Sequence, residues 1–190
     1  AAAGSAQDTK PLVQPEVGQA GKDVVWVPTP DALVEKMLDL AKVTAADYVI
    51  DLGSGDGRTV IAAAKRGARA LGIEYNQELV DLSTEAAKTA GVADRASFAK
   101  ADLFESDFSK ATVITMFLLT DINLKLRPKL LDLKPGTRVV SNTFRMGSWE
   151  PDETATVEGD CPSWCTALLW IIPAKVDGAW KLGDDVLKLF

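Results

Sequence analysis

The residues best suited to chemistry lie in one short segment that directly follows an apolar stretch. Val49 and Ile50 lead into Asp51-Leu-Gly-Ser-Gly-Asp-Gly57, in which glycine recurs at every second position. Glycine tolerates positive φ and lets a ligand approach the backbone closely. The next segment has a helical pattern, so its free N–H groups would face the same crevice. A strand, a glycine-rich turn and a helix in this order indicate a site for a nucleotide-like ligand.

Three carboxylates accompany this loop. Asp51 precedes the first glycine by two positions, where a buried carboxylate disfavours a pyrophosphate but suits a ligand bearing an ammonium group. Glu74 ends the second predicted strand, where it can accept hydrogen bonds from a ribose diol. Asp102 ends the third predicted strand and can accept from an adenine amino group. The Gly-x-Gly-x-Gly spacing departs from the dinucleotide fingerprint, Gly-x-Gly-x-x-Gly.

Other polar residues, near the carboxyl ends of the predicted strands, are candidates for contacts with a ligand or an acceptor. Thr29 precedes Pro30 and could serve as the N-cap of the first helix, as a cofactor contact, or as both. Asp121 and Asn123 follow the fourth predicted strand, and Asn142 lies at the end of the fifth. We treat these last three as candidates for positioning an acceptor, with helix capping an equal alternative for Asp121.

Composition excludes several classes of chemistry. The 190 residues include no histidine, which excludes Ser-His-Asp machinery, His-ligated zinc and an imidazole proton shuttle. The two cysteines, Cys161 and Cys165, are too few for a structural zinc site, so we expect no metal centre. They are either ordinary free thiols or a small-loop disulfide, and the disulfide would imply an oxidising compartment.

Strand and helix patterns alternate through most of the chain. This alternation predicts a mostly parallel sheet with helices on both faces. The predicted strands cover 48–52, 68–75, 96–100, 112–118 and 137–143, and the predicted helices run from Pro30 and over 59–66, 76–90 and 122–131. Beyond Trp149 the pattern becomes all-β, with strands over 155–158, 166–176 and 180–182 and a hairpin turn at Asp177-Gly178. We expect this hairpin to join the edge of the same sheet.

The chain length fits one domain. Residues 1–22 lack a periodic apolar pattern and predict a mobile N-terminal arm, which leaves 23–190 as a single domain. The small residues near Ala1 resemble the end of a signal peptide and equally a cloning scar, so the location stays open between the cytoplasm and export. No apolar run approaches the roughly 18 residues of a membrane span.

The Asp51–Gly57 loop, together with Glu74 and Asp102, resembles the cofactor motifs of the class I S-adenosylmethionine-dependent methyltransferases. The resemblance covers Val24 to Thr143 and implies a Rossmann-like, doubly wound α/β sheet of seven strands, mostly parallel, with an antiparallel C-terminal hairpin. It implies S-adenosylmethionine as cofactor, with S-adenosylhomocysteine as product. The cofactor contacts that follow from it are Thr29, Asp51, Gly53, Ser54, Gly55, Gly57, Glu74, Tyr75, Asp102 and Leu103.

A narrower resemblance rests on Val27-Pro-Thr-Pro30, on the glycine loop through Arg58, and on Leu130 through Val140-Ser-Asn-Thr-Phe144. These are similar to a subgroup of small methyltransferases that includes bacterial proteins of unassigned substrate. The subgroup also includes mitochondrial protein-lysine methyltransferases of the adenine nucleotide translocator and of the c-ring protein of ATP synthase. The similarity implies transfer to an amine-type acceptor such as a protein lysine. Because the net charge is −6, we expect no nucleic-acid partner.

Two other functions remain open at this level. One is a non-catalytic S-adenosylmethionine-binding or envelope interaction module, and the other is a nicotinamide-dependent oxidoreductase, which the glycine spacing disfavours. The tryptophans of the tail also allow two interpretations, because aromatic residues in strands usually belong to the core but can form a wall for a substrate. They are Trp149, Trp164, Trp170 and Trp180.

Overall fold

The structure is a computed structural model, and it describes residues 13–159, 161–176, 178–182 and 185–189. Its helices are α1 (Asp31–Leu40), α2 (Arg58–Lys65), α3 (Gln77–Thr89) and α4 (Thr120–Leu131). Its strands are β1 (Tyr48–Leu52), β2 (Arg69–Glu74), β3 (Ala96–Lys100), β4 (Val113–Met116), β5 (Arg138–Asn142), β6 (Glu153–Thr156), β7 (Thr166–Ile171), β8 (Gly178–Leu182) and β9 (Asp185–Leu189).

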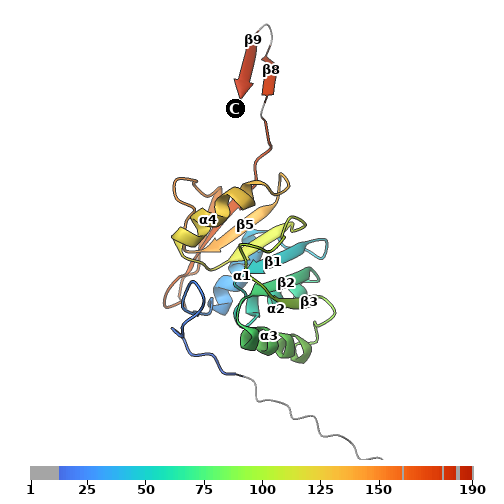
Figure 1. Ribbon diagram of the computed structural model, residues 1–190, viewed down its shortest axis with the longest axis vertical. Coiled ribbons are helices and arrows are strands. Elements are labelled where there is room, and N and C mark those ends of the chain that lie inside the picture. Colours follow the sequence, from blue (N-terminus) through green and yellow to red (C-terminus); the bar gives the residue numbers. More distant parts are fainter. Residues whose placement is uncertain (1–12, 160, 177, 183–184, 190) are drawn as a thin grey trace, which may run out of the picture.

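Seven strands form one sheet in the order β3-β2-β1-β4-β5-β7-β6. The first five in this order run parallel, and β7 lies antiparallel to both β5 and β6. The chain order reverses beside β1, which has β2 on one side and β4 on the other (Figure 1). The predicted doubly wound α/β sheet is confirmed, and its carboxyl edge beside this switch point is where such sheets bind ligands.

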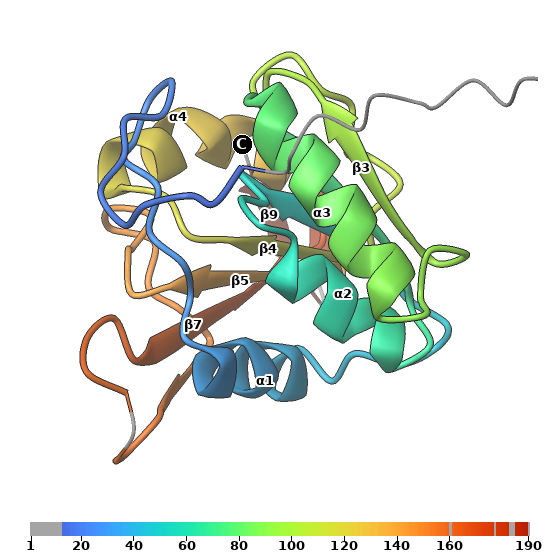
Figure 2. The same cartoon turned by 90° about the horizontal axis from the view of Figure 1, so that it is seen from below.

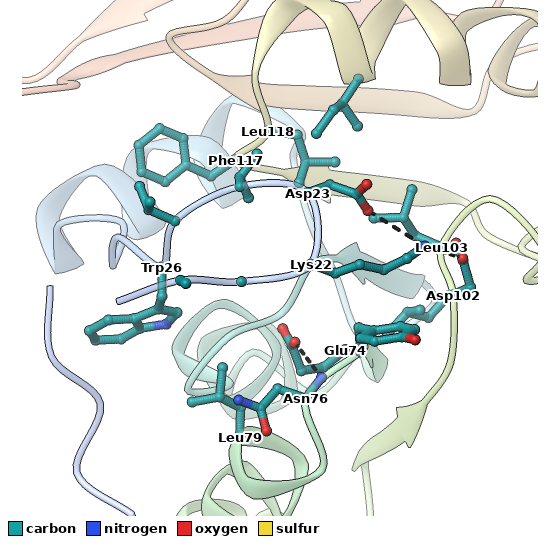
Figure 3. Close-up of a pocket in the computed structure, with 18 of the residues that line it drawn as sticks. Lys22, Asp23, Trp26, Glu74, Asn76, Leu79, Asp102, Leu103, Phe117 and Leu118 are labelled. Atoms are coloured by element: carbon teal, nitrogen blue, oxygen red, sulfur yellow. Dashed lines mark hydrogen bonds and ion pairs between the residues drawn. The ribbon is translucent and has the colours of Figure 1, made fainter. Parts of the chain in front are cut away.

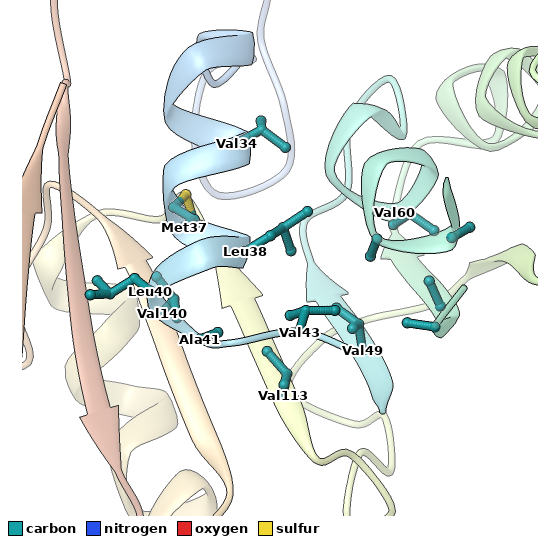
Figure 4. Packing of buried hydrophobic residues seen from close by; sticks show 14 of the residues in the cluster. Val34, Met37, Leu38, Leu40, Ala41, Val43, Val49, Val60, Val113 and Val140 are labelled. Atoms are coloured by element: carbon teal, nitrogen blue, oxygen red, sulfur yellow. The ribbon is translucent and has the colours of Figure 1, made fainter. Parts of the chain in front are cut away.

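Side chains alternate between two apolar layers along each central strand. Val49, Val113 and Val140 pack with α1, α2 and α3 on one face, where α1 crosses the strands (Figure 4). Ile50 and Ile114, one position along their strands, pack with α4 on the opposite face. Successive side chains of a strand point to opposite faces, so near-continuous apolar runs give a sheet buried on both sides. Figure 2 shows α4 apart from α1, α2 and α3.

Local signals explain where two helices begin. The Asn76 side chain accepts the Glu78 N–H at 2.9 Å and caps α3, as its sequence position predicts. The predicted cap of α1 is wrong, because Pro30 and not Thr29 is the N-cap residue. The Pro30 carbonyl accepts the Leu33 and Val34 N–H groups, and no side chain caps this helix.

The tail differs from the prediction in its strand partners. As expected, β7 joins the sheet edge beside β5, but its hairpin partner is β6. Residues 180–182 belong instead to β8, which pairs with β9 as a separate two-stranded sheet standing apart from the main body (Figure 1). Pro173 explains why β7 ends at Ile171 and not at 176 as predicted, since proline has no N–H to donate to a strand ladder. Gly178 begins β8 rather than forming the predicted turn, and Asp177 lies outside the described residues.

Part of the predicted N-terminal arm forms a loop against the domain. The Gly18 N–H donates to the Trp26 carbonyl at 2.8 Å, and the Trp26 N–H donates to the Gln19 carbonyl at 2.9 Å. The predicted boundary after residue 22 falls inside this loop. No helix in the described ranges is both long enough and apolar enough to cross a bilayer.

Candidate functional site

Two adjoining cavities lie where the loops leave the carboxyl ends of the parallel strands. The larger has a volume of about 620 Å³, within the roughly 300–1,000 Å³ typical of small-molecule sites. The smaller measures about 40 Å³ and lies between the glycine loop and the residues before α1. Trp26, Gly53 and Phe117 line both cavities. The N-terminal loop contributes one wall of the larger cavity (Figure 3).

The glycine loop has the backbone geometry that its sequence predicts. Gly53, Gly55 and Gly57 adopt φ values of 76°, 54° and 80°. A Cβ at Gly55 would lie 2.7 Å from Nε1 of Trp26. Gly53 and Gly55 line the cavities, whereas Gly57 lines neither and serves as the N-cap residue of α2. The first two therefore provide close approach for a ligand, and the third provides the turn.

Glu74 fastens the glycine loop to the end of β2. Its Oε2 accepts the Gly55 N–H at 2.9 Å. Its Oε1 accepts the Asn76 N–H, also at 2.9 Å (Figure 3). Each carboxylate oxygen has a second lone pair, and the side chain lines the larger cavity. Glu74 is thus oriented by the backbone and keeps acceptor capacity for a diol.

Asp102 lies two residues beyond β3 and faces the same cavity. Its Oδ1 accepts the Phe104 N–H at 2.9 Å, and its Oδ2 forms an ion pair with Lys22 from the N-terminal loop (Figure 3). The hydrogen bond from Lys22, together with that from Phe104, lowers the pKa of Asp102. The Lys22 ammonium also lies 4.9 Å from the ring centroid of Tyr75. Tyr75 and Leu103, two of the expected cofactor contacts, also line this cavity.

Asp51 is the buried carboxylate beneath the loop. It accepts the Thr115 hydroxyl at 2.6 Å and lines the smaller cavity with Ser54. Burial raises the pKa of Asp51 to about 7, and the negative charges of Asp56 and Glu74 act in the same direction, while the Thr115 hydrogen bond opposes them. A cation bound next to Asp51 would offset these costs. The residue is therefore suited to a ligand with an ammonium group.

Thr29 also lines the smaller cavity. Its Oγ1 accepts from Nδ2 of Asn142 at 3.4 Å, and its carbonyl accepts from Nη1 of Arg58 at 3.0 Å. Arg58 also forms a bidentate pair with Asp56 across the start of α2. Thr29 is thus held in place by two hydrogen bonds and lines the small cavity together with Asp51.

The three candidates for positioning an acceptor line neither cavity. Asp121 is exposed in the first turn of α4, where Leu119 is the N-cap residue, so side-chain capping by Asp121 is wrong. The Asn123 amide is buried and donates to the Phe144 carbonyl at 3.1 Å. Asn142 is also buried, and its Oδ1 accepts from the Thr143 hydroxyl at 2.9 Å. The two amides hold loops at this edge together.

Sequence reasoning missed Lys22, Trp26 and Phe117, which all line the larger cavity. Phe117 directly follows β4, so its place at the carboxyl edge was a usable signal. Lys22 and Trp26 reach the site only because the N-terminal loop folds back across the strand ends, and no local pattern marks such a fold.

These residues fit S-adenosylmethionine. Its ribose diol matches the acceptors on Glu74, its adenine amino group matches Asp102, and its ammonium group matches the buried carboxylate of Asp51. The close contact that a Cβ at Gly55 would make shows that the loop leaves room only for a bare backbone.

Comparison with known proteins agrees with this geometry. The family described as ANTKMT methyltransferase domain matches residues 51–153. A protein-lysine N-methyltransferase of Saccharolobus islandicus is 49% identical over 138 residues, covering 71% of this chain and 86% of that protein. A Mus musculus lysine N-methyltransferase, named for the C subunit of ATP synthase, is 38% identical over 73% of this chain, and the match spans 56% of its own length.

Among solved structures, an RNA methyltransferase from Salinibacter ruber in complex with S-adenosyl-L-homocysteine has a TM-score of 0.74 and 50% identity, covering 79% of this chain and 96% of that one. The family match supports a methyltransferase and not the alternative of a nicotinamide-dependent oxidoreductase. The chain belongs to the ANTKMT methyltransferase domain family and is a class I S-adenosylmethionine-dependent methyltransferase.

Proposed function

We propose that the chain methylates the side-chain amine of a protein lysine. The observation that carries this proposal is the 49% identity to a protein named protein-lysine N-methyltransferase, of which this chain covers 86%. The Mus musculus and Homo sapiens relatives, also named lysine N-methyltransferases, support the same acceptor class.

The chain's own residues would bind and orient the cofactor. Glu74 would hold the ribose, Asp102 the adenine, and the Asp51 loop with Thr29 the amino-acid end. S-adenosylmethionine supplies the electrophilic methyl group when bound. The protein must then place a neutral amine in line with that group and exclude water. A site without histidine can do this by positioning alone.

Charge at the carboxyl edge favours a cationic acceptor. Asp121 lies in the first turn of α4 and Glu158 lies two residues beyond β6, so both are at this edge, and both are exposed. Carboxylates there attract a lysine side chain and repel the phosphates of an RNA. The overall charge of −6 acts in the same direction.

The test is methyl transfer from labelled S-adenosylmethionine in parallel to poly-L-lysine, to a protein extract and to total RNA. We expect label in the protein arms, recovered as methylated lysine by mass spectrometry. Label confined to RNA would contradict the proposal and favour the acceptor class for which the Salinibacter ruber relative is named. Cofactor binding by calorimetry without transfer to any arm would favour the non-catalytic binding module.

A further inference from the structure

Three aromatic side chains form a continuous group at the carboxyl edge. The rings of Phe117 and Phe144 stack with centroids 5.9 Å apart. The Trp164 ring lies 5.9 Å from Phe117 at an interplanar angle of 60°. These separations fall within the range of favourable aromatic pairs. The three residues, here called the edge rings, come from the ends of β4 and β5 and from the loop before β7.

The edge rings begin where the two cavities meet. Phe117 lines the larger cavity, which Glu74 and Asp102 border, and also the smaller one, which Asp51 and Thr29 border. The reacting centre of a cofactor bound across both would lie between its adenosine and its amino-acid end, beside Phe117. Phe144 and Trp164 each pack against Phe117, and of the two Trp164 is exposed to solvent, at 41%.

Unfavourable backbone geometry places two of these rings. Thr143 has φ 58° immediately before Phe144, and Trp164 itself has φ 53°. Side chains of this bulk rarely adopt left-handed backbone, and such residues concentrate at active sites and ligand clamps. The Cys161–Cys165 disulfide closes the loop that carries Trp164 and settles the alternative that the sequence left open. A large exposed aromatic residue is thus held by a covalent link.

The other described tryptophan side chains of the tail behave differently. Trp170 is fully buried, and its indole N–H donates to the Trp149 carbonyl at 2.9 Å. The two rings pack with centroids 6.1 Å apart. These residues belong to the core, which leaves Trp164 as the tryptophan of the described tail with a ring at the site edge.

We propose that the edge rings form the binding channel for the acceptor lysine, and that the Cys161–Cys165 disulfide holds Trp164 in it. This inference rests on the proposed function. The lysine stem would pack on the ring faces and its cationic end would interact with their π-electrons before deprotonation. Before the transfer, the lysine ammonium loses its proton to solvent. The neutral amine then forms the N–C bond while the S–C bond breaks. The electron pair stays on sulfur, and the resulting ammonium loses its proton to solvent when a further methylation follows.

The experiment compares the wild type with Trp164→Ala, Trp164→Phe and the double variant Cys161→Ser/Cys165→Ser, with Ser163→Ala as the matched control in the same loop. Steady-state methylation of poly-L-lysine gives KM and kcat. Calorimetry gives the affinity of each protein for S-adenosylhomocysteine and, without cofactor, for a trimethyllysine peptide.

We expect Trp164→Ala to raise KM and the peptide Kd about tenfold, the scale of one cation–π contact, with S-adenosylhomocysteine affinity unchanged. Trp164→Phe should recover most of the loss, and the cysteine double variant should behave like Trp164→Ala. Ser163→Ala should match the wild type.

Three results would overturn the channel, and they are distinguishable. If the wild type methylates poly-L-lysine but Trp164→Ala leaves KM and peptide affinity unchanged, the proposed function stands and the channel is wrong. If the wild type methylates RNA and no lysine, the proposed function and the channel fail together. Loss of S-adenosylhomocysteine binding in Trp164→Ala would also overturn the channel, because it would place Trp164 in the cofactor site.

Discussion

The cofactor half of the site and the aromatic half are built in different ways. At the ends of β2 and β3, carboxylates are oriented by backbone N–H groups, as Glu74 is by Gly55 and Asn76. Beside β4, β5 and β7, rings from three segments far apart in sequence meet, and one of them depends on a disulfide. The carboxylates of the first half lie at the ends of three neighbouring parallel strands, whereas the second half also needs β7 to return antiparallel beside β5.

The largest expected effect concerns the rigidity of the cofactor half. Gly57→Ala should lower the free energy of unfolding by about 2–4 kcal/mol, since it combines left-handed strain with overpacking. Its Cβ would lie 2.8 Å from the Phe98 ring and from Cβ of Ser83. Gly91→Ala is the control, because Gly91 also has positive φ but nothing lies within 4 Å of its Cβ position. Urea unfolding that shows equal losses would contradict the packing argument.

Glu74→Ala separates binding of the cofactor from binding of the acceptor. We expect S-adenosylhomocysteine affinity to fall by about 1–3 kcal/mol, the scale of hydrogen bonds to a charged group. The KM for the acceptor should stay unchanged, because Glu74 lies on the cofactor side. Asp81→Asn on the exposed face of α3 is the control. Calorimetry that shows unchanged affinity for Glu74→Ala would remove this residue from the cofactor site.

The raised pKa of Asp51, about 7, predicts a pH effect on the cofactor half. If the ionised carboxylate pairs with the ligand ammonium, affinity should fall about tenfold from pH 8 to pH 6, as protonation competes. Binding at pH 6 should release a proton, measurable by calorimetry in buffers of different ionisation enthalpy. Asp51→Asn should make the affinity independent of pH over this range, and a retained dependence would assign the effect to another group.

The raised pKa of Asp51 also makes the free energy of unfolding depend on pH. The folded pKa of Asp51 lies above its ordinary value of 3.8, so the native state holds the extra proton between these two values. Without ligand, this group therefore lowers the free energy of unfolding as the pH rises from about 4 to about 7. Unfolding of Asp51→Asn against pH should lack that contribution.

The smallest expected effect concerns the N-terminal loop. Lys22 pairs with Asp102, the carboxylate assigned to adenine. Lys22→Met should tighten S-adenosylhomocysteine binding by about threefold or less, since exposed ion pairs are weak, and salt should reduce the difference. Lys100→Met, at another lysine lining the cavity, is the control. Weaker binding in Lys22→Met would instead make Lys22 part of the ligand's contacts.

Local sequence signals predicted most of the fold, and most of the residues expected to contact the cofactor line the two cavities. Gly53 and Gly55 line the cavity with bare backbone, because glycine readily adopts the positive φ that this loop requires. The strand exchange in the tail was not predictable by the same means. Residues 153–156 and 180–182 both have strand patterns, and the choice of partner depends on where Pro173 ends β7 and on which edge of the sheet is free.

The acceptor candidates show the same limit. Asn142 ends β5 and Asn123 follows β4, as the sequence predicts, but position along the chain does not say whether a side chain faces a cavity or a neighbouring loop. Both amides turned inward, where their hydrogen bonds hold Phe144 and Thr29. Trp164 carried no positional signal, since its place depends on the antiparallel return of β7.

That return of the chain has a consequence for how the protein could diversify. Because β7 runs against β5, the segment 157–165 that connects β6 to β7 arrives at the same edge as the loops of the parallel strands. It can lengthen, shorten or change composition without altering the register of any strand beneath it. A reversed strand pair thus supplies a replaceable module for acceptor choice, while the glycine loop and its carboxylates stay untouched on the other side of the switch point.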